Sequence, residues 1–506
     1  METYWRVTDE ISACRSARFG DPALSANSAS AVSHATILPG PFIPRLAPVP
    51  LMMFSLIRVP VCMIVLTTAV CSAALRVSPD GRHLATDSGE PFFWLGDTAW
   101  ELLHRLNEEE TAEYLRNRAQ KGFTVIQTVV LAELDGLNIP NAAGHLPLID
   151  RDPTRPNPAY FEHVDKVVAL AAELGLYVGL LPTWGDKFNR RWGVGPEVFT
   201  PEKARGYAAW LAARYRDAPI IWILGGDRAP DNPAHVRVIE AMAEGIRSVV
   251  ERRQLITYHP SGARSSAEFF HERSWLDFNL FQSGHSRRDN PNFEFTRRDL
   301  ARKPAKPVID GEPCYEDHPI NRRQVPLPGW FGEFEVRRAG YWSLLAGAAG
   351  HTYGHHSVWQ MWETARQPLS FARTPWRQAL DYPGAFQMGV MRRCFEEYPW
   401  TRLRPSQDAL GNLPEDPSAG VLAAVDAERQ FAFVYSPYGY PFTLARDALV
   451  DGPWKARWVD PRTGHTIDSG MHMDGDARMP FDPPGEIARG NDWLLIVTAS
   501  SFEPAR

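Results

Sequence analysis

Short runs of apolar residues alternate with helix-like stretches over residues 76–400. The apolar runs are continuous, which is typical of strands buried on both faces of a parallel sheet. Eight such runs lie at residues 92–100, 123–130, 176–184, 219–227, 254–260, 276–285, 306–313 and 350–359. Amphipathic helices are predicted at residues 107–122, 159–175, 201–217 and 233–250. This order predicts an α/β fold in which residues 76–400 form a (β/α)8 TIM barrel.

An open, doubly wound sheet would show the same alternation, but no GxGxxG or GxxxxGK[ST] loop follows any predicted strand. The pattern changes between residues 395 and 420. The segments "GVLAAVDAERQFAFVYSP", "WKARWVDPRTGHTID" and "NDWLLIVTAS" are short apolar runs broken by Pro, Gly and Asp. Residues 410–506 are therefore predicted to form a small antiparallel β-sandwich domain.

The N-terminal part of the chain has a different character. Residues 1–51 lack periodicity, which predicts disorder or a start codon placed too far upstream. Residues 52–74 combine Arg58 with an apolar stretch and small residues at its end, so a secretory signal peptide is predicted. The stretch is shorter than the roughly 20 residues of a membrane span. We expect export to the periplasm or the cell exterior, with no membrane span. A lipid anchor would attach at Cys71, although Val70 is larger than the residue expected before it.

The amino-acid composition excludes some classes of function. A net charge of −6 and a pI near 6.2 argue against a nucleic-acid partner. Of the five cysteines, only Cys314 and Cys394 follow the predicted signal peptide, and no CxxC motif is present, so free thiols and no structural zinc are expected. The 17 tryptophans could form flat surfaces for sugars or fill a large core.

Two carboxylates stand out at the predicted carboxyl ends of the strands, where the active sites of TIM barrels form. Asp227 ends the fourth strand, Glu312 follows the seventh, and each comes directly after a glycine. The fourth and seventh strands lie across a barrel mouth, so the two side chains can face each other over a sugar. Glycoside hydrolysis needs such a pair, one acting as acid and the other as nucleophile or base. The alternative is that Asp227 caps the next helix and Glu312 forms a structural salt bridge.

Other residues near the strand ends are predicted to bind the substrate. They are Asp97, Trp100, Gln127, Trp184, His259, Gln282, His285, Tyr315, His351, Tyr353, His355 and Trp359. The stretch "HTYGHH" lacks the HExxH spacing, and consecutive strand residues point to opposite faces, so no metal site is predicted. No cofactor is expected.

Four motifs carry a family resemblance. "FFWLGDTAW", "WILGGDRAP", "VIDGEPCYE" and "GHTYGHHSVWQ" resemble segments of the apiosidase-like glycoside hydrolases, a family long filed as a domain of unknown function. The resemblance covers residues 76–400, and the C-terminal part is similar to the small β domain, labelled "putative collagen-binding", that commonly follows. It implies a retaining hydrolase in which Asp227 is the acid/base and Glu312 the nucleophile. It further implies that the substrate is apiose in the plant pectin rhamnogalacturonan II.

Two other functions fit the same residues. One is a non-catalytic protein that binds oligo- or polysaccharides, and the other is a glycosidase for another pentose such as arabinofuranose. Collagen binding is not favoured, because the short acidic strands of the β domain offer no mechanism for it. If the protein is a hydrolase, we expect burial and Glu312 to raise the pKa of Asp227. We expect a donor such as His259, Tyr353 or His355 to keep Glu312 ionised.

Overall fold

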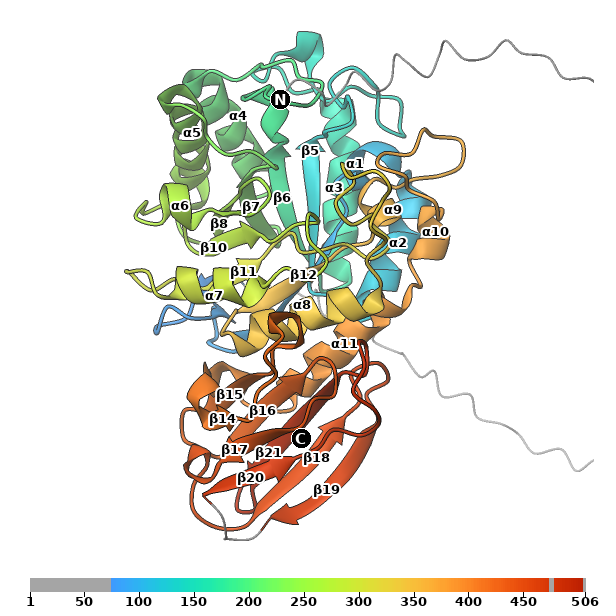
Figure 1. Ribbon diagram of the computed structural model, residues 1–506. Helices are drawn as coiled ribbons and strands as arrows, with labels where there is room; N and C mark the ends of the chain where they lie inside the picture. Colours follow the sequence, from blue (N-terminus) through green and yellow to red (C-terminus); the bar gives the residue numbers. More distant parts are fainter. Residues whose placement is uncertain (1–73, 473–476, 504–506) are drawn as a thin grey trace, which may run out of the picture. The chain divides into compact units, whose positions relative to one another are not determined.

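The computed structural model describes residues 74–472 and 477–503. The predicted N-terminal segment 1–51, nearly all of the predicted signal peptide and Cys71 lie outside these residues. Eight parallel strands form a barrel, as predicted, with their carboxyl ends at one mouth (Figure 1). In chain order they are β4 (Trp94–Thr98), β5 (Val125–Leu131), β6 (Tyr177–Thr183), β7 (Ile220–Gly225), β8 (Ile256–His259), β10 (Asn279–Gln282), β11 (Val308–Asp310) and β12 (Gly350–Tyr353).

The barrel closes between β8 and β10. The backbone N–H of Asp277 donates to the carbonyl of Ile256 over 2.9 Å, and the hydroxyl of Thr257 donates to the carbonyl of Phe278 over 2.8 Å. The short strand β9 (Arg264–Ser265) pairs antiparallel with β10. Near the start of the described chain, β1 (Leu75–Val77), β2 (Leu84–Thr86) and β3 (Pro91–Phe92) form a separate antiparallel sheet.

Helices surround the barrel (Figure 1). They are α1 (Leu102–Arg105), α2 (Glu108–Gln120), α3 (Pro158–Glu173), α4 (Pro201–Arg214), α5 (Pro233–Val250), α6 (Ala267–Phe270), α7 (Asn292–Leu300), α8 (Glu333–Leu345), α9 (His356–Trp359), α10 (Trp376–Ala379) and α11 (Pro383–Glu396). Local sequence sets their ends. For example, Asn107 and Glu110 form a capping box at the start of α2, which satisfies two backbone N–H groups.

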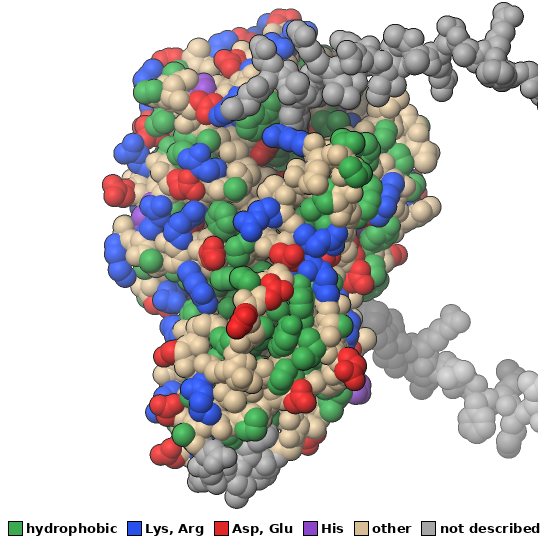
Figure 2. Space-filling view, in the orientation of Figure 1, with side chains coloured by type: hydrophobic (Ala, Val, Ile, Leu, Met, Phe, Trp, Pro, Cys, Tyr) green, Lys and Arg blue, Asp and Glu red, His purple; other side chains and the backbone are tan. Residues whose placement is uncertain are grey.

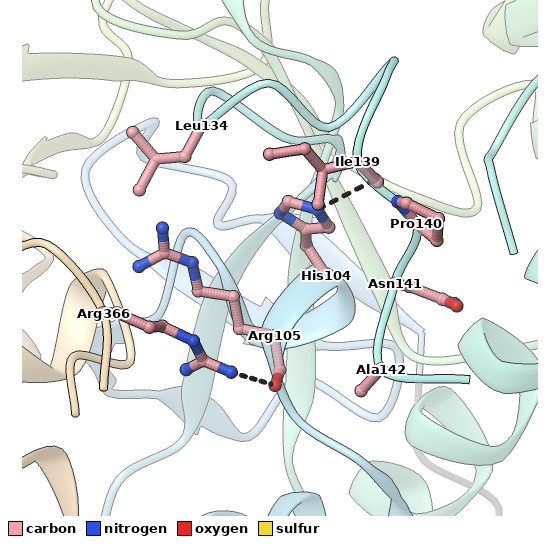
Figure 3. A pocket seen from close by; sticks show the side chains of 8 residues that line it. All are labelled: His104, Arg105, Leu134, Ile139, Pro140, Asn141, Ala142 and Arg366. Atoms are coloured by element: carbon pink, nitrogen blue, oxygen red, sulfur yellow. Dashed lines mark hydrogen bonds between the residues drawn. The ribbon is translucent and has the colours of Figure 1, made fainter. Parts of the chain in front are cut away.

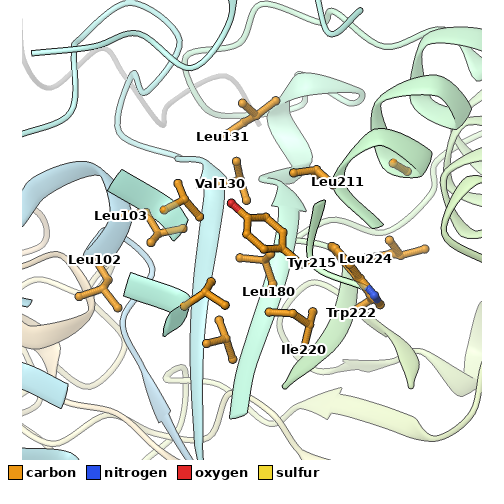
Figure 4. Close-up of a cluster of buried hydrophobic side chains, with 14 of the residues drawn as sticks. Leu102, Leu103, Val130, Leu131, Leu180, Leu211, Tyr215, Ile220, Trp222 and Leu224 are labelled. Atoms are coloured by element: carbon orange, nitrogen blue, oxygen red, sulfur yellow. The ribbon is translucent and has the colours of Figure 1, made fainter. Parts of the chain in front are cut away.

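Strand residues alternate between the inside and the outside of the barrel. Trp94, Val125, Ile223, Leu280 and Ile309 belong to one buried cluster, which fills the interior. Their strand neighbours pack outward against the helices. Figure 4 shows part of this outer layer, formed where β5, β6 and β7 meet the surrounding helices.

The C-terminal domain is an antiparallel β-sandwich, as predicted. One sheet has the order β13 (Leu403–Pro405), β15 (Leu422–Asp426), β16 (Phe431–Ser436), β21 (Trp493–Ala499), β18 (Trp454–Val459) and β19 (Thr466–His472). The other has the order β14 (Leu410–Gly411), β17 (Phe442–Ala445) and β20 (Arg478–Phe481). Apolar side chains from both sheets share one core.

The barrel contacts this domain through α8. The rings of Tyr341 on α8 and Tyr435 on β16 stack with centroids 4.6 Å apart. Arg337, also on α8, forms a buried ion pair with Asp492 over 2.6 Å. The guanidinium therefore fixes the helix to the second domain with a directional contact.

Two further properties concern the described residues. Cys314 and Cys394 are free thiols, which confirms the expectation from the sequence. Within residues 74–472 and 477–503, no helix is both long enough and apolar enough to cross a membrane. On the face drawn in Figure 2, basic and acidic side chains are interspersed over the surface.

Candidate active site

The end of β7 has an unusual backbone. Gly225, Gly226 and Asp227 have φ values of +95°, +102° and +50°, a left-handed run that favours glycine. A Cβ at Gly225 would lie 2.4 Å from the carbonyl oxygen of His259, and one at Gly226 would lie 2.9 Å from the ring of Trp184. Both glycines are therefore required by close contacts as well as by φ. The turn places Asp227 at the barrel mouth.

Asp227 does not cap the following helix. Asn232 caps α5, because its side-chain oxygen accepts the backbone N–H groups of Ala234 and His235 at 2.8 and 3.1 Å. The carboxylate of Asp227 instead accepts the indole N–H of Trp192 over 3.2 Å. The structure thus excludes the capping alternative for this residue.

Glu312, just beyond β11, lies between two histidines. Its Oε2 is 3.0 Å from Nε2 of His259, and its Oε1 is 3.1 Å from Nε2 of His285. Gly311 before it is held by Gln127, whose amide donates to the Gly311 carbonyl over 2.9 Å. These contacts fix both the carboxylate and the backbone that carries it.

The two carboxyl groups have opposite pKa shifts. Burial and the charge of Glu312 raise the pKa of Asp227, against the lowering effects of Arg228 and His259. Burial alone would raise the pKa of Glu312 as well, but the contacts from His259 and His285 outweigh it and lower that pKa to about 2. The proton is therefore held more tightly by Asp227 and less tightly by Glu312 than by free carboxyl groups. This pattern separates an acid from a nucleophile or base.

Aromatic rings surround the pair. Trp100, Trp184, Tyr315 and Trp359 belong to the apolar cluster that continues from the barrel interior to its mouth. The rings of Trp100 and Trp184 lie 5.3 Å apart, and the ring of His259 lies 5.3 Å from that of Trp100. Such rings can pack against the apolar faces of a sugar.

Several buried polar atoms near the strand ends have no hydrogen-bond partner among the described residues. They include Oε1 of Gln127, Nε1 of Trp184, Oε1 of Gln282 and the hydroxyl of Tyr315, together with Nε2 of His259 and Oε2 of Glu312, which lie 3.0 Å apart without hydrogen-bond geometry. Leaving such groups unpaired is costly, and a ligand rich in hydroxyl groups would supply partners.

The structure corrects three predicted substrate contacts. Asp97, His351 and Tyr353 occupy strand positions whose side chains point away from the barrel interior. Asp97 pairs with Arg118 of α2 over 2.6 Å and accepts the hydroxyl of Tyr114 over 2.5 Å. The hydroxyl of Tyr353 donates to Glu316 over 2.6 Å. These side chains brace strands against helices and do not line the mouth.

His355 is also misassigned. Its Nδ1 caps α9 by accepting the backbone N–H of Ser357 over 3.1 Å, and its ring lies 4.4 Å from that of Tyr382. Tyr353 and His355 were also expected as alternative donors to Glu312, and neither serves. Nε2 of the expected donor His259 lies 3.0 Å from Glu312 without hydrogen-bond geometry, and the hydrogen bond to this carboxylate comes from His285.

The sequence analysis missed several residues at the mouth. Trp192 lies on the loop after β6, and its ring stacks on the guanidinium of Arg228 at 3.9 Å. Glu133 follows β5 by two residues, and burial together with the charge of Asp227 raises its pKa to about 8. Glu133 could have been predicted from its position just after a strand end. The sequence of the loop that carries Trp192 gave no comparable signal.

A pocket of about 300 Å³ opens on the same side of the barrel (Figure 3). It lies between α1, the loop after β5 and the loop after α9, and Arg105 and Arg366 point toward it. The backbone N–H of its lining residue Leu134 donates to buried Glu101 over 3.1 Å. Asp227 and Glu312 are not among the lining residues, so the pocket is separate from the carboxylate pair. The described residues include no group of three or more His, Cys, Asp or Glu side chains arranged to hold a metal ion.

Comparisons with known proteins agree with this geometry. Residues 78–402 match the family described as "Apiosidase-like, catalytic domain", and residues 405–498 match "Putative collagen-binding domain of a collagenase". A solved structure called "Glycoside hydrolase" is 32% identical, with a TM-score of 0.78 over 86% of this chain and 99% of its own. A glycoside hydrolase family 5 structure from Bacteroides vulgatus is 31% identical, with a TM-score of 0.78 over 86% of this chain and 94% of its own. No curated protein sequence matches the chain.

The barrel, the carboxylate pair and these relatives define the protein as a glycoside hydrolase with a glycan substrate. Within that class, the chain belongs to the apiosidase-like family, because the catalytic-domain match spans more than half of its length.

Proposed function

We propose that the protein is a retaining glycoside hydrolase. Its proposed substrate is the apiose-containing side chains of the plant pectin rhamnogalacturonan II. Asp227 acts first as general acid and protonates the glycosidic oxygen. Glu312 attacks the anomeric carbon, so the bond to the leaving group breaks as a glycosyl–enzyme ester forms. Asp227, now ionised, removes a proton from water, and the water hydrolyses the ester.

One observation carries the mechanistic part of the proposal, namely the opposite pKa shifts of Asp227 and Glu312 at one barrel mouth. The raised pKa keeps a proton on Asp227 for the leaving group. The lowered pKa keeps Glu312 charged for attack. A retaining mechanism needs the two carboxyl groups about 5–5.5 Å apart, whereas inversion needs about 6.5–9.5 Å.

The substrate part rests on family membership. Apiosidase-like relatives support an apiose-bearing pectin, and the aromatic mouth with its unpaired Gln127, Trp184 and Gln282 atoms suits a sugar. Export through the signal predicted at residues 52–74 would bring the enzyme to such a polymer.

The test is hydrolysis of rhamnogalacturonan II oligosaccharides by the purified protein, followed by proton NMR of the first product formed. We expect the anomeric configuration to be retained and a sugar with the chromatographic mobility of apiose to be released. The Glu312→Gln variant should show no turnover, whereas Glu316→Gln is the matched control. Glu316 is buried like Glu312, but it is bound to Tyr353 outside the barrel interior.

Three outcomes would contradict parts of the proposal. An inverted first product would rule out the retaining mechanism. Release of arabinose instead of apiose would replace the substrate. Turnover by Glu312→Gln equal to that of the parent protein would remove the nucleophile assignment.

A further inference from the structure

The ring nitrogens of His259 have different partners. Its Nδ1 accepts the backbone N–H of Asp227 over 3.2 Å, and its Nε2 faces Oε2 of Glu312 at 3.0 Å. A ring nitrogen that accepts a hydrogen bond carries no proton, so the single proton of the neutral ring lies on Nε2. The backbone of one catalytic residue thus determines which nitrogen of His259 carries the proton beside the other.

His285 repeats this arrangement from another element. Its Nδ1 accepts the backbone N–H of Tyr315 over 3.3 Å, and its Nε2 lies 3.1 Å from Oε1 of Glu312. Oε1 of Glu312 therefore accepts a hydrogen bond from His285, and Oε2 lies 3.0 Å from Nε2 of His259 without hydrogen-bond geometry. The two rings come from β8 and from the loop after β10.

We propose that His259 and His285 are positioning residues for Glu312, that His285 donates its Nε2–H to this carboxylate while Nε2 of His259 approaches the other oxygen at 3.0 Å, and that the backbone N–H groups of Asp227 and Tyr315 fix both tautomers. Adding a proton at either Nδ1 would place two N–H donors against each other. Transferring an Nε2 proton to Glu312 would leave an imidazolate. Both rings therefore stabilise the charge of Glu312 without protonating it. The role of the two rings in positioning a nucleophile rests on the proposed function. The assignment of their tautomers rests on geometry alone.

The ring orientations follow from these contacts, because a half-turn about the Cβ–Cγ bond would put Cδ2 and Cε1 where Nδ1 and Nε2 lie. The ring of His285 stacks on His318 at 4.3 Å and contacts Tyr315 at 4.4 Å. The ring of His259 packs beside Trp100 and Trp184, at 5.3 and 6.1 Å. A flipped ring would lose its backbone donor and its nitrogen next to Glu312.

The other titratable groups around Glu312 make these donors necessary. Asp227 and Asp310 are both acidic, and the charge of Glu312 contributes to the raised pKa of each, after burial. The phenol of Tyr315 is buried as well, and burial and the charge of Glu312 raise its pKa. Without the two histidines, two neighbouring carboxyl groups would favour protonation of Glu312.

Two substitutions at His285 separate the functions of its nitrogens. In His285→Asn, the amide oxygen can still accept the N–H of Tyr315, but the donor to Glu312 is lost. In His285→Gln, the longer amide can reach Glu312 with an N–H. We expect the acid limb of kcat/KM on an activated aryl glycoside to move up by about one pH unit or more in the Asn variant. It should return toward the parent value in the Gln variant. The exposed His465, changed to Asn, is the matched control and should leave the profile unchanged.

A second measurement needs neither activity nor substitution. In the full-length protein labelled with 13C,15N-histidine, NMR ring shifts at neutral pH should report the Nε2–H tautomer for two buried histidines. The signals that disappear in the His259→Asn and His285→Asn variants assign them. A Nδ1–H tautomer or an imidazolium at either position would overturn the proposal. An acid limb unmoved in His285→Asn would also overturn it. Correct tautomers in a protein that hydrolyses no glycoside would instead contradict the proposed function.

Discussion

Glu312 and Asp492 are both buried carboxylates, but they differ in the side chains that surround their oxygens. Asp492, where the barrel meets the β domain, is held by the guanidinium of Arg337 at 2.6 and 2.9 Å and by the hydroxyl of Tyr435 at 2.9 Å. Glu312 is held by two imidazoles. The guanidinium brings a permanent positive charge to Asp492, whereas the proposed tautomers of His259 and His285 bring none to Glu312. The charge of Glu312 would then remain available at the barrel mouth.

The surroundings of the two residues differ in a second way. The neighbours of Asp492 satisfy it completely, and the contact joins two domains. The mouth instead gathers acidic groups, since Asp227 and Glu133 both have raised pKa values there. Such an arrangement costs stability, and perturbed titrations of this kind are typical of catalytic sites.

Several substitutions test this contrast between the barrel mouth and the contact with the β domain. The largest effect is expected for a substitution of Asp227. We expect Asp227→Asn to slow hydrolysis of substrates with poor leaving groups by about 10²–10⁴-fold, because the leaving oxygen is no longer protonated. An activated aryl glycoside, which leaves without a proton, should be cleaved nearly as fast as before in the step that forms the glycosyl enzyme. Steady-state and burst kinetics on both substrates would measure this. Equal losses on the two substrates would argue against the acid role.

At the domain contact, a matching substitution should affect stability rather than chemistry. Asp492→Asn leaves the buried guanidinium of Arg337 without its counter-charge. We expect the free energy of unfolding to fall by about 3–5 kcal/mol, while kcat of the folded enzyme is unchanged. The control is Glu244→Gln, which removes a pair with Arg205 whose side chains are 52% and 59% exposed, and should cost about 0–1 kcal/mol. Loss of kcat in folded Asp492→Asn would mean that the β domain takes part in catalysis.

The barrel strands and the two carboxylates at the mouth were predictable from the sequence, whereas the domain contact was not. Largely apolar runs predicted all eight barrel strands, because burial on both faces of the sheet favours apolar residues at inward and outward positions alike. The glycines before Asp227 and Glu312 marked the candidate catalytic pair, since a turn with positive φ or a close contact explains a glycine at each position. The ion pair of Arg337 with Asp492 had no such signal, because its partners are 155 residues apart in the chain.

The errors at the mouth have one physical origin. A continuous apolar run does not show which of its residues point inward, so Asp97, His351 and Tyr353 were placed on the wrong face. His259 and Gln282 end their strands at inward-facing positions, since each directly follows an outward-facing residue, Tyr258 and Phe281. Trp192 was missed, since the path of its loop depends on contacts distant in sequence.

The turn that positions Asp227 allows a test of strain at the mouth. Gly226→Ala would place a methyl group 2.9–3.0 Å from Trp184 and Gly185, in a backbone with φ of +102°. We expect a loss of about 1–3 kcal/mol in the free energy of unfolding, together with reduced activity as Asp227 shifts. Gly206→Ala on α4, where a Cβ would meet nothing within 4 Å, is the control and should be neutral or stabilising. Wild-type activity in Gly226→Ala would show that the mouth tolerates movement of this turn.

The smallest effect concerns the pH range rather than the maximum rate. Activity requires Glu312 ionised and Asp227 protonated. The pKa of Glu312, lowered to about 2, places the acid limb of kcat/KM below the usual range of a glutamate, near 4.3. The raised pKa of Asp227 places the basic limb above the usual range of an aspartate, because activity falls as this proton is lost. Asp227→Asn should abolish the basic limb and keep the acid limb, measured on an activated aryl glycoside. A basic limb that persists unchanged in Asp227→Asn would assign it to another group, and Glu133, whose pKa is raised to about 8, would be the next residue to substitute.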